Sequence, residues 1–468
     1  MINTLPEQSG SGDSGNCSSV SMPEPSEIVF LIGLDLKDEK NFPRHPSETA
    51  GSRSFCFEKS LKEMKSLAEA AGMTVSATFT QSLPKANTGY YIGSGKIEEI
   101  RAAAEMLSPS RILIDSQLTP MQLRNLTEAF DLPVTDRTAL ILEIFSGRAR
   151  THEANLQVEY AKLQYMLPRL AGLHKELGRQ GGTSGAMSNK GLGEKKIELD
   201  RRHIEHKMAE VRRQLEDVSR ERATQRNARM RSGLSRVSLA GYTNAGKSTI
   251  MNGLLSLFGD AADRQVLEKD MLFATLDTTV RRIEPGKDRS PFLLSDTVGF
   301  IDNLPTTLIK AFRSTLEEAK YADLLLIVSD LSDPDYKENL SVTVSTLSEI
   351  GAGDIPRLYV FNKADRAPEE IGSNISSLLI SDEDARITIS AKNPKDIERL
   401  ADAICSCLNR EKKETKLLIP YSNGSIISVL KASSDLTILD YTAQGTVISA
   451  WLSEADRTKY RSFLLPEA

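Results

Sequence analysis

The stretch G-Y-T-N-A-G-K-S-T at residues 241–249 constrains the fold of this chain more than any other. It fits G-x-x-x-x-G-K-[ST], follows a strand-like run over 236–240 and precedes a helix-compatible segment over 249–257. In that setting the glycines let backbone N–H groups wrap around anionic oxygens. The pattern predicts a phosphate-binding loop; the alternative is a glycine turn that precedes a lysine by chance. The predicted loop comprises Gly241, Tyr242, Thr243, Asn244, Ala245, Gly246, Lys247, Ser248 and Thr249.

Metal and phosphate ligands are predicted in this loop and in one later segment. Lys247 is expected to reach the β- and γ-phosphates of a nucleotide, and the Ser248 hydroxyl to bind Mg²⁺. F-L-L-S-D-T-V-G over 292–299 is typical of an apolar strand with a carboxylate at its end. We expect Asp296 to hold Mg²⁺ through water and the Gly299 N–H to meet the γ-phosphate. The contact segment is therefore Asp296, Thr297, Val298 and Gly299.

Two further segments are suited to guanine. N-K-A-D at 362–365 follows an apolar run over 358–361, and S-A-K at 390–392 follows a strand-like run over 386–389. The carboxylate of Asp365 can accept hydrogen bonds from guanine N1–H and N2–H₂, a pattern that adenine lacks, and the S-A-K backbone can donate to guanine O6. All these pieces in this order predict a GTP-binding domain. The predicted base contacts are Asn362, Lys363, Ala364, Asp365, Ser390, Ala391 and Lys392.

The segment between the phosphate loop and Asp296 contains F-A-T-L-D over 273–277. A GTPase needs a mobile hydroxyl here that completes the Mg²⁺ shell only when the γ-phosphate is present. We predict Thr275 for this role, with Thr278 and Thr279 as alternatives. The predicted nucleotide contacts in this segment are Phe273, Ala274, Thr275, Leu276 and Asp277.

Phe300 follows Gly299, at the place where Ras-like enzymes carry a glutamine that orients the attacking water. A phenylalanine ring cannot orient water, so unassisted hydrolysis of GTP should be slow. The sequence therefore identifies no catalytic side chain, and we expect a partner or a cation to supply the missing group.

Charge is unevenly distributed along the chain. The 468 residues have a net charge of −5, which argues against an indiscriminate nucleic-acid binder, yet residues 151–236 carry 18 Lys or Arg against 11 Asp or Glu. The four cysteines include no C-x-x-C and fit a reducing compartment. The apolar runs are too short to span a membrane, and the first residues resemble no export signal, so we expect a cytoplasmic protein.

The patterns predict an α/β fold in five parts. Residues 1–26 are typical of a disordered tail, and residues 27–150 alternate strands with helices, as in a small parallel-sheet domain. Residues 151–235 favour an antiparallel helical hairpin, 236–410 the P-loop GTPase domain, and 411–468 a small α+β domain. In this last part we expect strands at 416–420, 425–430, 436–441 and 445–452, then a helix at 453–463.

Residues 156–170 and 197–218 each contain apolar residues at alternating spacings of three and four positions. These two seams predict the arms of a coiled coil. The connection over 178–193 holds six glycines with cations in and beside it, which predicts a flexible basic tip suited to a phosphate backbone. A solvated linker is the alternative for the tip, as a solvated face is for the charged arms. The predicted rRNA contacts are Arg179, Lys190, Lys195, Arg201 and Arg202.

A wider resemblance to a known family rests on six segments of the sequence. Four belong to the nucleotide site: G-Y-T-N-A-G-K-S-T, F-A-T-L-D, D-T-V-G-F-I and N-K-A-D. Two lie outside it: D-S-Q-L-T-P-M-Q-L-R-N-L and R-A-R-T-H-E-A-N-L-Q-V-E-Y. The chain resembles the HflX-type ribosome-associated GTPases from Glu27 to its end. The resemblance implies a Mg²⁺-dependent GTP hydrolase that binds the large ribosomal subunit and its rRNA when GTP is bound. It also implies splitting or rescue of stalled or idle ribosomes under stress, by a protein that we expect to be a monomer.

Two residue patterns qualify this resemblance. Asn244 is the fourth loop residue, as in potassium-activated members of the translation-factor-related GTPases, which implies a K⁺ site; alternatively, Asn244 only stabilises the turn. Relatives carry G-G-I-G-T-R-G-P-G-E-T-Q-L-E at the hairpin tip, where this chain has G-G-T-S-G-A-M-S-N-K-G-L-G-E-K-K-I-E over 181–198. The alternative function is therefore a GTP-regulated RNA-binding or large-subunit assembly factor that never separates subunits.

Overall fold

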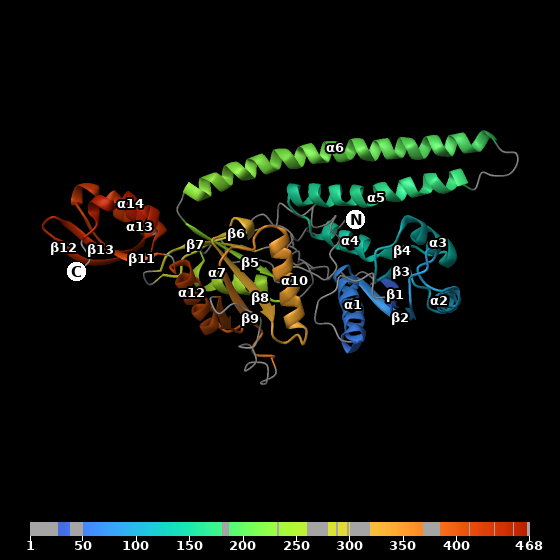
Figure 1. The fold of residues 1–468 in the computed structure, drawn as a ribbon, viewed down its shortest axis with the longest axis horizontal. Helices are drawn as coiled ribbons and strands as arrows, with labels where there is room; N and C mark the ends of the chain where they lie inside the picture. Colours follow the sequence, from blue (N-terminus) through green and yellow to red (C-terminus); the bar gives the residue numbers. More distant parts are fainter. Residues whose placement is uncertain are drawn as a thin grey trace, which may run out of the picture.

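The computed structural model in Figure 1 places three β-sheets along the long axis of the molecule. A four-stranded sheet lies at one end beneath a long helical hairpin, a six-stranded sheet lies in the middle, and a three-stranded sheet lies at the other end. This arrangement confirms the predicted α/β fold class. The structure describes residues 27–37, 50–179, 187–231, 234–259, 279–286, 289–296, 299, 319–367, 384–410, 412–434, 436–452 and 454–465.

The N-terminal sheet is parallel, with strand order β2-β1-β3-β4. Its strands are β1 (Glu27–Leu36), β2 (Met73–Leu83), β3 (Arg111–Ile114) and β4 (Val134–Asp136). The apolar run of β1 is buried from Val29 to Leu34, as expected for a strand covered on both faces. Its helices are α1 (Ala50–Ala70), α2 (Ser94–Leu107), α3 (Pro120–Phe130) and α4 (Arg137–Arg148).

Both faces of this sheet carry a core. Met64 and Leu67 of α1 and Phe145 of α4 pack on one face, while Ile100 of α2 and Leu126 of α3 pack on the other. The start of α3 also follows from the sequence, because the Thr119 hydroxyl accepts the Gln122 N–H in a capping box. This is the doubly covered parallel sheet that the strand–helix alternation predicts.

The helical hairpin consists of α5 (His152–Arg179) and α6 (Met187–Arg231), which run antiparallel along the top of Figure 1. Leu156 and Leu163 of α5 bury against Ile204 and Val211 of α6, so the predicted seam is confirmed. The tip differs from expectation, because α6 already begins at Met187 and Lys190 and Lys195 therefore lie in a helix. Gly191 and Gly193 each cost this helix about 1 kcal/mol, a cost that pairing of the arms can offset.

The six-stranded sheet has strand order β10-β9-β8-β5-β7-β6, and only β6 is antiparallel to its neighbour. Parallel strands meet the same edge of a sheet with their carboxyl ends, so β5, β7 and β9 deliver Gly241, Asp296 and Asn362 to one edge. The strands are β5 (Ser235–Gly241), β6 (Val280–Ile283), β7 (Phe292–Asp296), β8 (Leu324–Asp330), β9 (Arg357–Asn362) and β10 (Ala385–Thr388).

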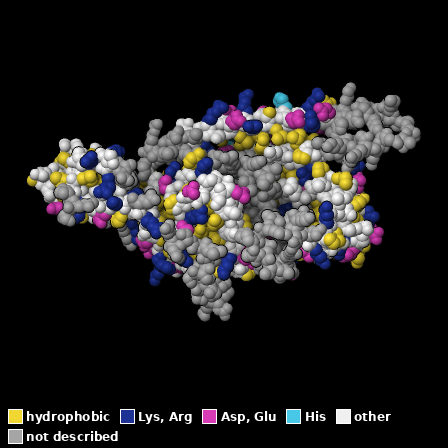
Figure 2. All heavy atoms as spheres, in the orientation of Figure 1, with side chains coloured by type: hydrophobic (Ala, Val, Ile, Leu, Met, Phe, Trp, Pro, Cys, Tyr) yellow, Lys and Arg dark blue, Asp and Glu magenta, His cyan; other side chains and the backbone are white. Residues whose placement is uncertain are grey.

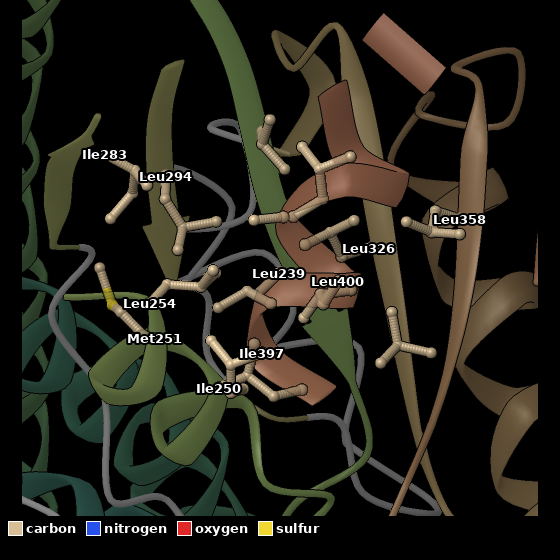
Figure 3. Packing of buried hydrophobic residues seen from close by; sticks show 14 of the residues in the cluster. Leu239, Ile250, Met251, Leu254, Ile283, Leu294, Leu326, Leu358, Ile397 and Leu400 are labelled. Carbon is tan, nitrogen blue, oxygen red and sulfur yellow. The ribbon is translucent and has the colours of Figure 1, made fainter. Parts of the chain in front are cut away.

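Helices α7 (Lys247–Phe258) and α12 (Pro394–Leu408) cover one face of this sheet. Figure 3 shows Ile250 and Leu254 of α7 meeting Ile397 and Leu400 of α12 over the strands. Helix α10 (Tyr336–Glu349) packs on the opposite face. The phosphate loop is thus held between a buried central strand and a buried helix.

The C-terminal sheet is antiparallel, with strand order β11-β13-β12. The expected strand at 425–430 is wrong, because residues Ser425–Ser433 form helix α13. Ile426, Ile427 and Leu430 face the core while Val429 is exposed, which is the three-to-four spacing of a helix and not the alternation of a strand. The elements are β11 (Lys413–Ile419), η3 (Tyr421–Asn423), β12 (Leu436–Thr442), β13 (Gly445–Leu452), α14 (Glu454–Lys459) and η4 (Arg461–Phe463).

Two absences apply to the part of the chain that the structure describes. None of its helices combines the length and the apolar character that crossing a membrane requires. Within the same residues, no three or more His, Cys, Asp or Glu side chains gather as a metal site would require.

A buried ion-pair network ties the N-terminal elements together. Arg137, the first residue of α4, donates to Asp115 at the end of β3 at 2.7 Å and to Glu63 of α1. Ser60 donates to the same Asp115 at 2.6 Å. Burial alone would lower the pKa of Arg137, but the two carboxylates raise its pKa above the usual value. The guanidinium therefore stays charged, and both carboxylates depend on it.

Replacing Arg137 with alanine should destabilise the protein by about 3–5 kcal/mol, because two buried carboxylates lose their counter-ion. The free energy of unfolding would be measured by urea denaturation followed by circular dichroism. Arg124→Ala is the matched control, because it breaks an exposed i, i+4 ion pair with Glu128 within α3. It should lower the free energy of unfolding by less than about 1 kcal/mol. Equal losses for the two variants would contradict the assigned role of the network.

Candidate functional site: a phosphate loop joined to a base-recognition edge

The phosphate loop begins where β5 ends, at Gly241, and finishes at the first residue of α7, Lys247. A Cβ at Gly241 would lie 2.3 Å from the Val328 carbonyl oxygen, so only glycine lets the loop pass this close to β8. Gly246 adopts φ 93° and precedes the helix as its N-cap. The loop therefore turns tightly and aims the N-terminus of α7 at its own interior, as an anion site requires.

Lys247 is buried and is only 7% exposed. Its Nζ donates to the carbonyl oxygens of Gly241 and Tyr242 at 3.0 and 2.8 Å. Burial lowers the pKa of Lys247 to about 8, while Asp296 acts in the opposite direction. The ammonium is thus held inside the loop, where nucleotide phosphates would supply the negative charge that the loop lacks.

Two oxygen ligands suited to a hard cation meet beside the loop. The Ser248 hydroxyl donates to Asp296 Oδ2 at 2.9 Å, and Asp296 is fully buried at the end of β7. Hydroxyl and carboxylate oxygens are the ligands that Mg²⁺ prefers. Gly299 lies against the same loop, since a Cβ there would be 2.8 Å from Thr243 Cγ2. The predicted metal and γ-phosphate positions therefore converge.

Asn362 connects the phosphate loop to the base-recognition edge. Its Nδ2 donates to the Ala245 carbonyl at 2.9 Å, and its Oδ1 accepts the Ala391 N–H at 2.9 Å. A Cβ at Gly246 would lie 2.1 Å from the Asn362 amide nitrogen, so only glycine at position 246 leaves room for the Asn362 side chain. One side chain thus sets the distance between the segments predicted for phosphate and for guanine.

Asp365 faces the same edge and is oriented by Ser390, whose hydroxyl donates to Asp365 Oδ1 at 2.7 Å. This hydrogen bond lowers the pKa of Asp365, so the side chain is a carboxylate acceptor. Lys363, with φ 59°, pairs with Asp330 at 2.7 Å. An ionised acceptor at Asp365 is what guanine N1–H and N2–H₂ need.

The outer side of the phosphate loop contacts the N-terminal part of the chain. The Tyr242 hydroxyl donates to Glu63, the same carboxylate that pairs with Arg137, and Lys59 lies 5.8 Å from the centroid of the Tyr242 ring. Lys59 also donates to Asn339 of α10 at 2.8 Å. A cavity of about 390 Å³ lies at this junction, and the exposed Asn244 lines it.

Apart from Arg179 at the end of α5 and Lys190 and Lys195 within α6, the predicted site residues fall into three groups. The phosphate loop, Asp296, Gly299, the N-K-A-D segment and the S-A-K segment lie at one edge of the central sheet. Arg201 and Arg202 are exposed on α6 and pair with Glu198 of the same helix. Along the edge formed by the hairpin, Figure 2 shows both cationic and acidic side chains. The predicted Phe273, Ala274, Thr275, Leu276, Asp277, Thr297, Val298 and Phe300, and the alternative Thr278, lie outside the described residues.

Sequence reasoning missed the contacts that lie behind the loop. Nothing in the phosphate-loop pattern specifies a tyrosine at position 242, and Glu63 is an ordinary helix residue by sequence. The usable signal was V-T-D-R-T over 134–138, in which Arg137 follows a strand end directly. An arginine at such a place needs carboxylate partners, but their identity depends on the tertiary fold.

Comparison with known families matches three consecutive segments of the chain. Residues 58–146 match the family described as GTP-binding GTPase N-terminal, and residues 148–229 match its middle region. Residues 236–363 match the family described as 50S ribosome-binding GTPase. The matched segments cover the N-terminal sheet apart from β1, nearly all of the hairpin and most of the central sheet.

Full-length relatives decide the family. The chain is 39% identical to GTPase HflX of Caldanaerobacter subterraneus over 87% of its own length and 91% of that protein. It is 38% identical to GTPase HflX of Akkermansia muciniphila over 94% and 98% of the two chains. The chain belongs to the HflX GTPase family. A crystal structure of a GTP-binding protein from Sulfolobus solfataricus with GDP is also similar, at 23% identity, 82% and 99% coverage and a TM-score of 0.42.

Membership of the HflX family and the lysine buried in the loop together predict a pH-dependent affinity for GDP. Phosphate oxygens raise the pKa of a neighbouring ammonium, and Lys247 has a pKa of about 8 without them. Below that pH the lysine is charged in both states and the full affinity is present. Above it, binding must take up a proton, so affinity should fall by up to about tenfold per pH unit.

Titration calorimetry with GDP between about pH 6.5 and 9.5, in buffers of different ionisation enthalpy, measures both the affinity and the proton uptake. Lys247→Arg is the control, because a guanidinium stays charged throughout this range and should remove the step. Wild-type binding without proton uptake above pH 8 would show that the lysine is not neutral in the free protein.

Proposed function

We propose that this GTPase binds the large ribosomal subunit and its rRNA in a GTP-dependent way, and that it splits or rescues stalled or idle ribosomes. The observation that carries the proposal is the contact of Tyr242 with Glu63, because it joins the phosphate loop to the part of the chain that carries the hairpin. The name of the matching family, 50S ribosome-binding GTPase, supports the choice of subunit. We propose that the protein acts as a monomer in the cytoplasm.

In this proposal the nucleotide is held by three sets of groups. The loop N–H groups and Lys247 bind the phosphates, Asp365 reads guanine, and Ser248 with Asp296 holds Mg²⁺, the latter through water. Thr275 joins the metal only while the γ-phosphate is present. Mg²⁺ held by these oxygens would neutralise charge on the phosphates, and GTP occupancy would change the contacts that Thr275 and Gly299 make with the nucleotide.

The hairpin is the proposed contact with rRNA. Helix α6 has 45 residues, which corresponds to a length of about 68 Å. Arg201 and Arg202 project from it with 45% and 71% of their side chains exposed, and among the described residues they pair with Glu198 and Glu205 on the same helix. Such ion pairs are weak and can be exchanged for phosphate contacts. Arg179, Lys190 and Lys195 extend the proposed contact toward the tip.

Sedimentation with purified large ribosomal subunits tests this function. We expect at least about tenfold tighter binding with a non-hydrolysable GTP analogue than with GDP, which corresponds to about 1.4 kcal/mol. Arg201→Ala should weaken binding and reduce the dependence of log affinity on log salt by about one. Arg399→Ala, which removes an exposed arginine of α12 with the same i, i+3 pairing, should change neither value.

Equal binding with GDP and with the analogue would contradict the proposal. Light scattering of intact ribosomes then separates splitting from binding alone, because splitting lowers the scattered intensity. An unchanged intensity with retained subunit binding would favour the assembly-factor function.

We also propose that K⁺ bound near Asn244 supplies positive charge beside the phosphates, in a chain that lacks the water-orienting glutamine. Asn244 is exposed beside the phosphate loop and holds φ 60°, in the left-handed region that Asn adopts more often than most residues. GTP turnover should be severalfold faster in KCl than in NaCl. Asn244→Gly removes the oxygen but accepts the same φ, so it should abolish the difference and leave GDP binding intact. Equal turnover in the two salts would remove K⁺ from the mechanism.

A further inference from the structure

The third residue of the phosphate loop, Thr243, carries a polar group that the contacts described above do not use. Only 7% of the residue is exposed, and its hydroxyl has no hydrogen-bond partner among the described residues. Buried polar groups are nearly always hydrogen-bonded, so an exception in a functional site calls for an explanation such as a catalytic role. The hydroxyl is also hidden from solvent, so only a molecule that enters the site with the nucleotide can satisfy it.

The Thr243 side chain lies where the γ-phosphate is expected. A Cβ at Gly299 would be 2.8 Å from Thr243 Cγ2 and 3.1 Å from Lys247 Nζ, so these three residues meet at one point. Lys247 is the residue expected to reach the β- and γ-phosphates, and the Gly299 N–H is expected to meet the γ-phosphate. The threonine is therefore placed beside the phosphate that hydrolysis removes.

The other polar side chains at this point are already engaged. Lys247 donates to two carbonyl oxygens of the loop, and the Ser248 hydroxyl donates to Asp296. Phe300 stands in the sequence where Ras-like enzymes have the glutamine that orients the attacking water. A hydroxyl offers one donor and two acceptor lone pairs, so a single threonine can bind a water and a phosphate oxygen at once.

We propose that the Thr243 hydroxyl holds the water that attacks GTP. The γ-phosphate enters between Lys247 and Gly299 and parts Gly299 from the loop, so that the water entering with it reaches Thr243. The hydroxyl then accepts a hydrogen bond from this water and donates one to an oxygen of the γ-phosphate. In phosphoryl transfer the protein contributes mainly position and charge, and a water fixed at the phosphorus lowers the barrier.

The hydroxyl is unchanged by the reaction that it assists. The water oxygen forms a bond to the γ-phosphorus, and the bond between this phosphorus and the β–γ bridging oxygen breaks. The electron pair of the broken bond stays on the bridging oxygen of GDP, and a proton of the water passes to an oxygen of the released phosphate. This inference concerns GTP hydrolysis itself and depends neither on ribosome binding nor on K⁺.

Single-turnover hydrolysis of GTP by the full-length protein with Mg²⁺ tests the proposal. Thr243→Val keeps the shape of the side chain but removes the hydroxyl, and it should slow hydrolysis by roughly 100-fold, the effect of losing one hydrogen bond to the reacting atoms. The affinities for GDP and for a non-hydrolysable GTP analogue should fall far less than the rate, because the contact acts mainly on the attacking water. Thr243→Ser keeps the hydroxyl and should retain most of the rate.

Ser238→Ala is the matched control. Ser238 is fully buried in β5, ahead of the loop, and its hydroxyl also lacks a hydrogen-bond partner among the described residues. Its removal should leave the rate of hydrolysis unchanged. Because Thr243→Val and Ser238→Ala each remove a buried hydroxyl without a partner, neither should lower the free energy of unfolding measured by urea denaturation.

Four results would each overturn the proposal. An unchanged rate in Thr243→Val would show that the hydroxyl takes no part in hydrolysis, and equal losses in the valine and serine variants would assign the effect to packing. A loss of affinity for the GTP analogue as large as the loss of rate would make the hydroxyl a ligand of bound GTP and not of the attacking water. A lower free energy of unfolding for Thr243→Val than for the wild type would show that the hydroxyl is already partnered before GTP binds.

Discussion

The hydrogen bonds of Asn362 hold the nucleotide site together. One amide group donates to the phosphate loop at Ala245 and accepts from the S-A-K segment at Ala391. The strands that carry these segments are joined in one sheet, but their loops extend beyond its edge and need a further connection. Both hydrogen bonds of the Asn362 amide are 2.9 Å long, so this side chain sets the distance between the phosphate loop and the S-A-K segment. A bound nucleotide must match that distance between its phosphates and its base.

The phosphate loop also has contacts on its outer side, and these connect it to the N-terminal part of the chain. Tyr242 reaches Glu63, Glu63 reaches Arg137, and Arg137 reaches Asp115 at the end of β3. Each link is charged or hydrogen-bonded and largely buried, so removal of one group takes a buried polar contact from its neighbour. This chain of contacts gives the phosphate loop a physical connection to the elements that precede the hairpin, which the proposed nucleotide-dependent binding to rRNA requires.

Much of this molecule could be predicted from its sequence, because local patterns determine it. The glycine loop, the strand ends at Asp296 and Asn362 and the seam through Leu156 and Val211 each have a period or a motif of their own. Helix α13 was mistaken for a strand because six residues are too few for the spacing of apolar side chains to separate a helix from a strand. The Tyr242–Glu63 contact could not be predicted, since it joins residues far apart in the chain.

Guanine selectivity of the nucleotide site is the claim on which the rest depends, because Asn362 aligns the phosphate loop with a base edge that only guanine completes. Titration calorimetry of the nucleotide-free protein with GDP and with ADP, in the same Mg²⁺ buffer, measures it most directly. We predict that GDP binds at least about a thousandfold more tightly, a difference of about 4 kcal/mol. Equal affinity for ADP would contradict the account, since Asp365 would then not be reading the base.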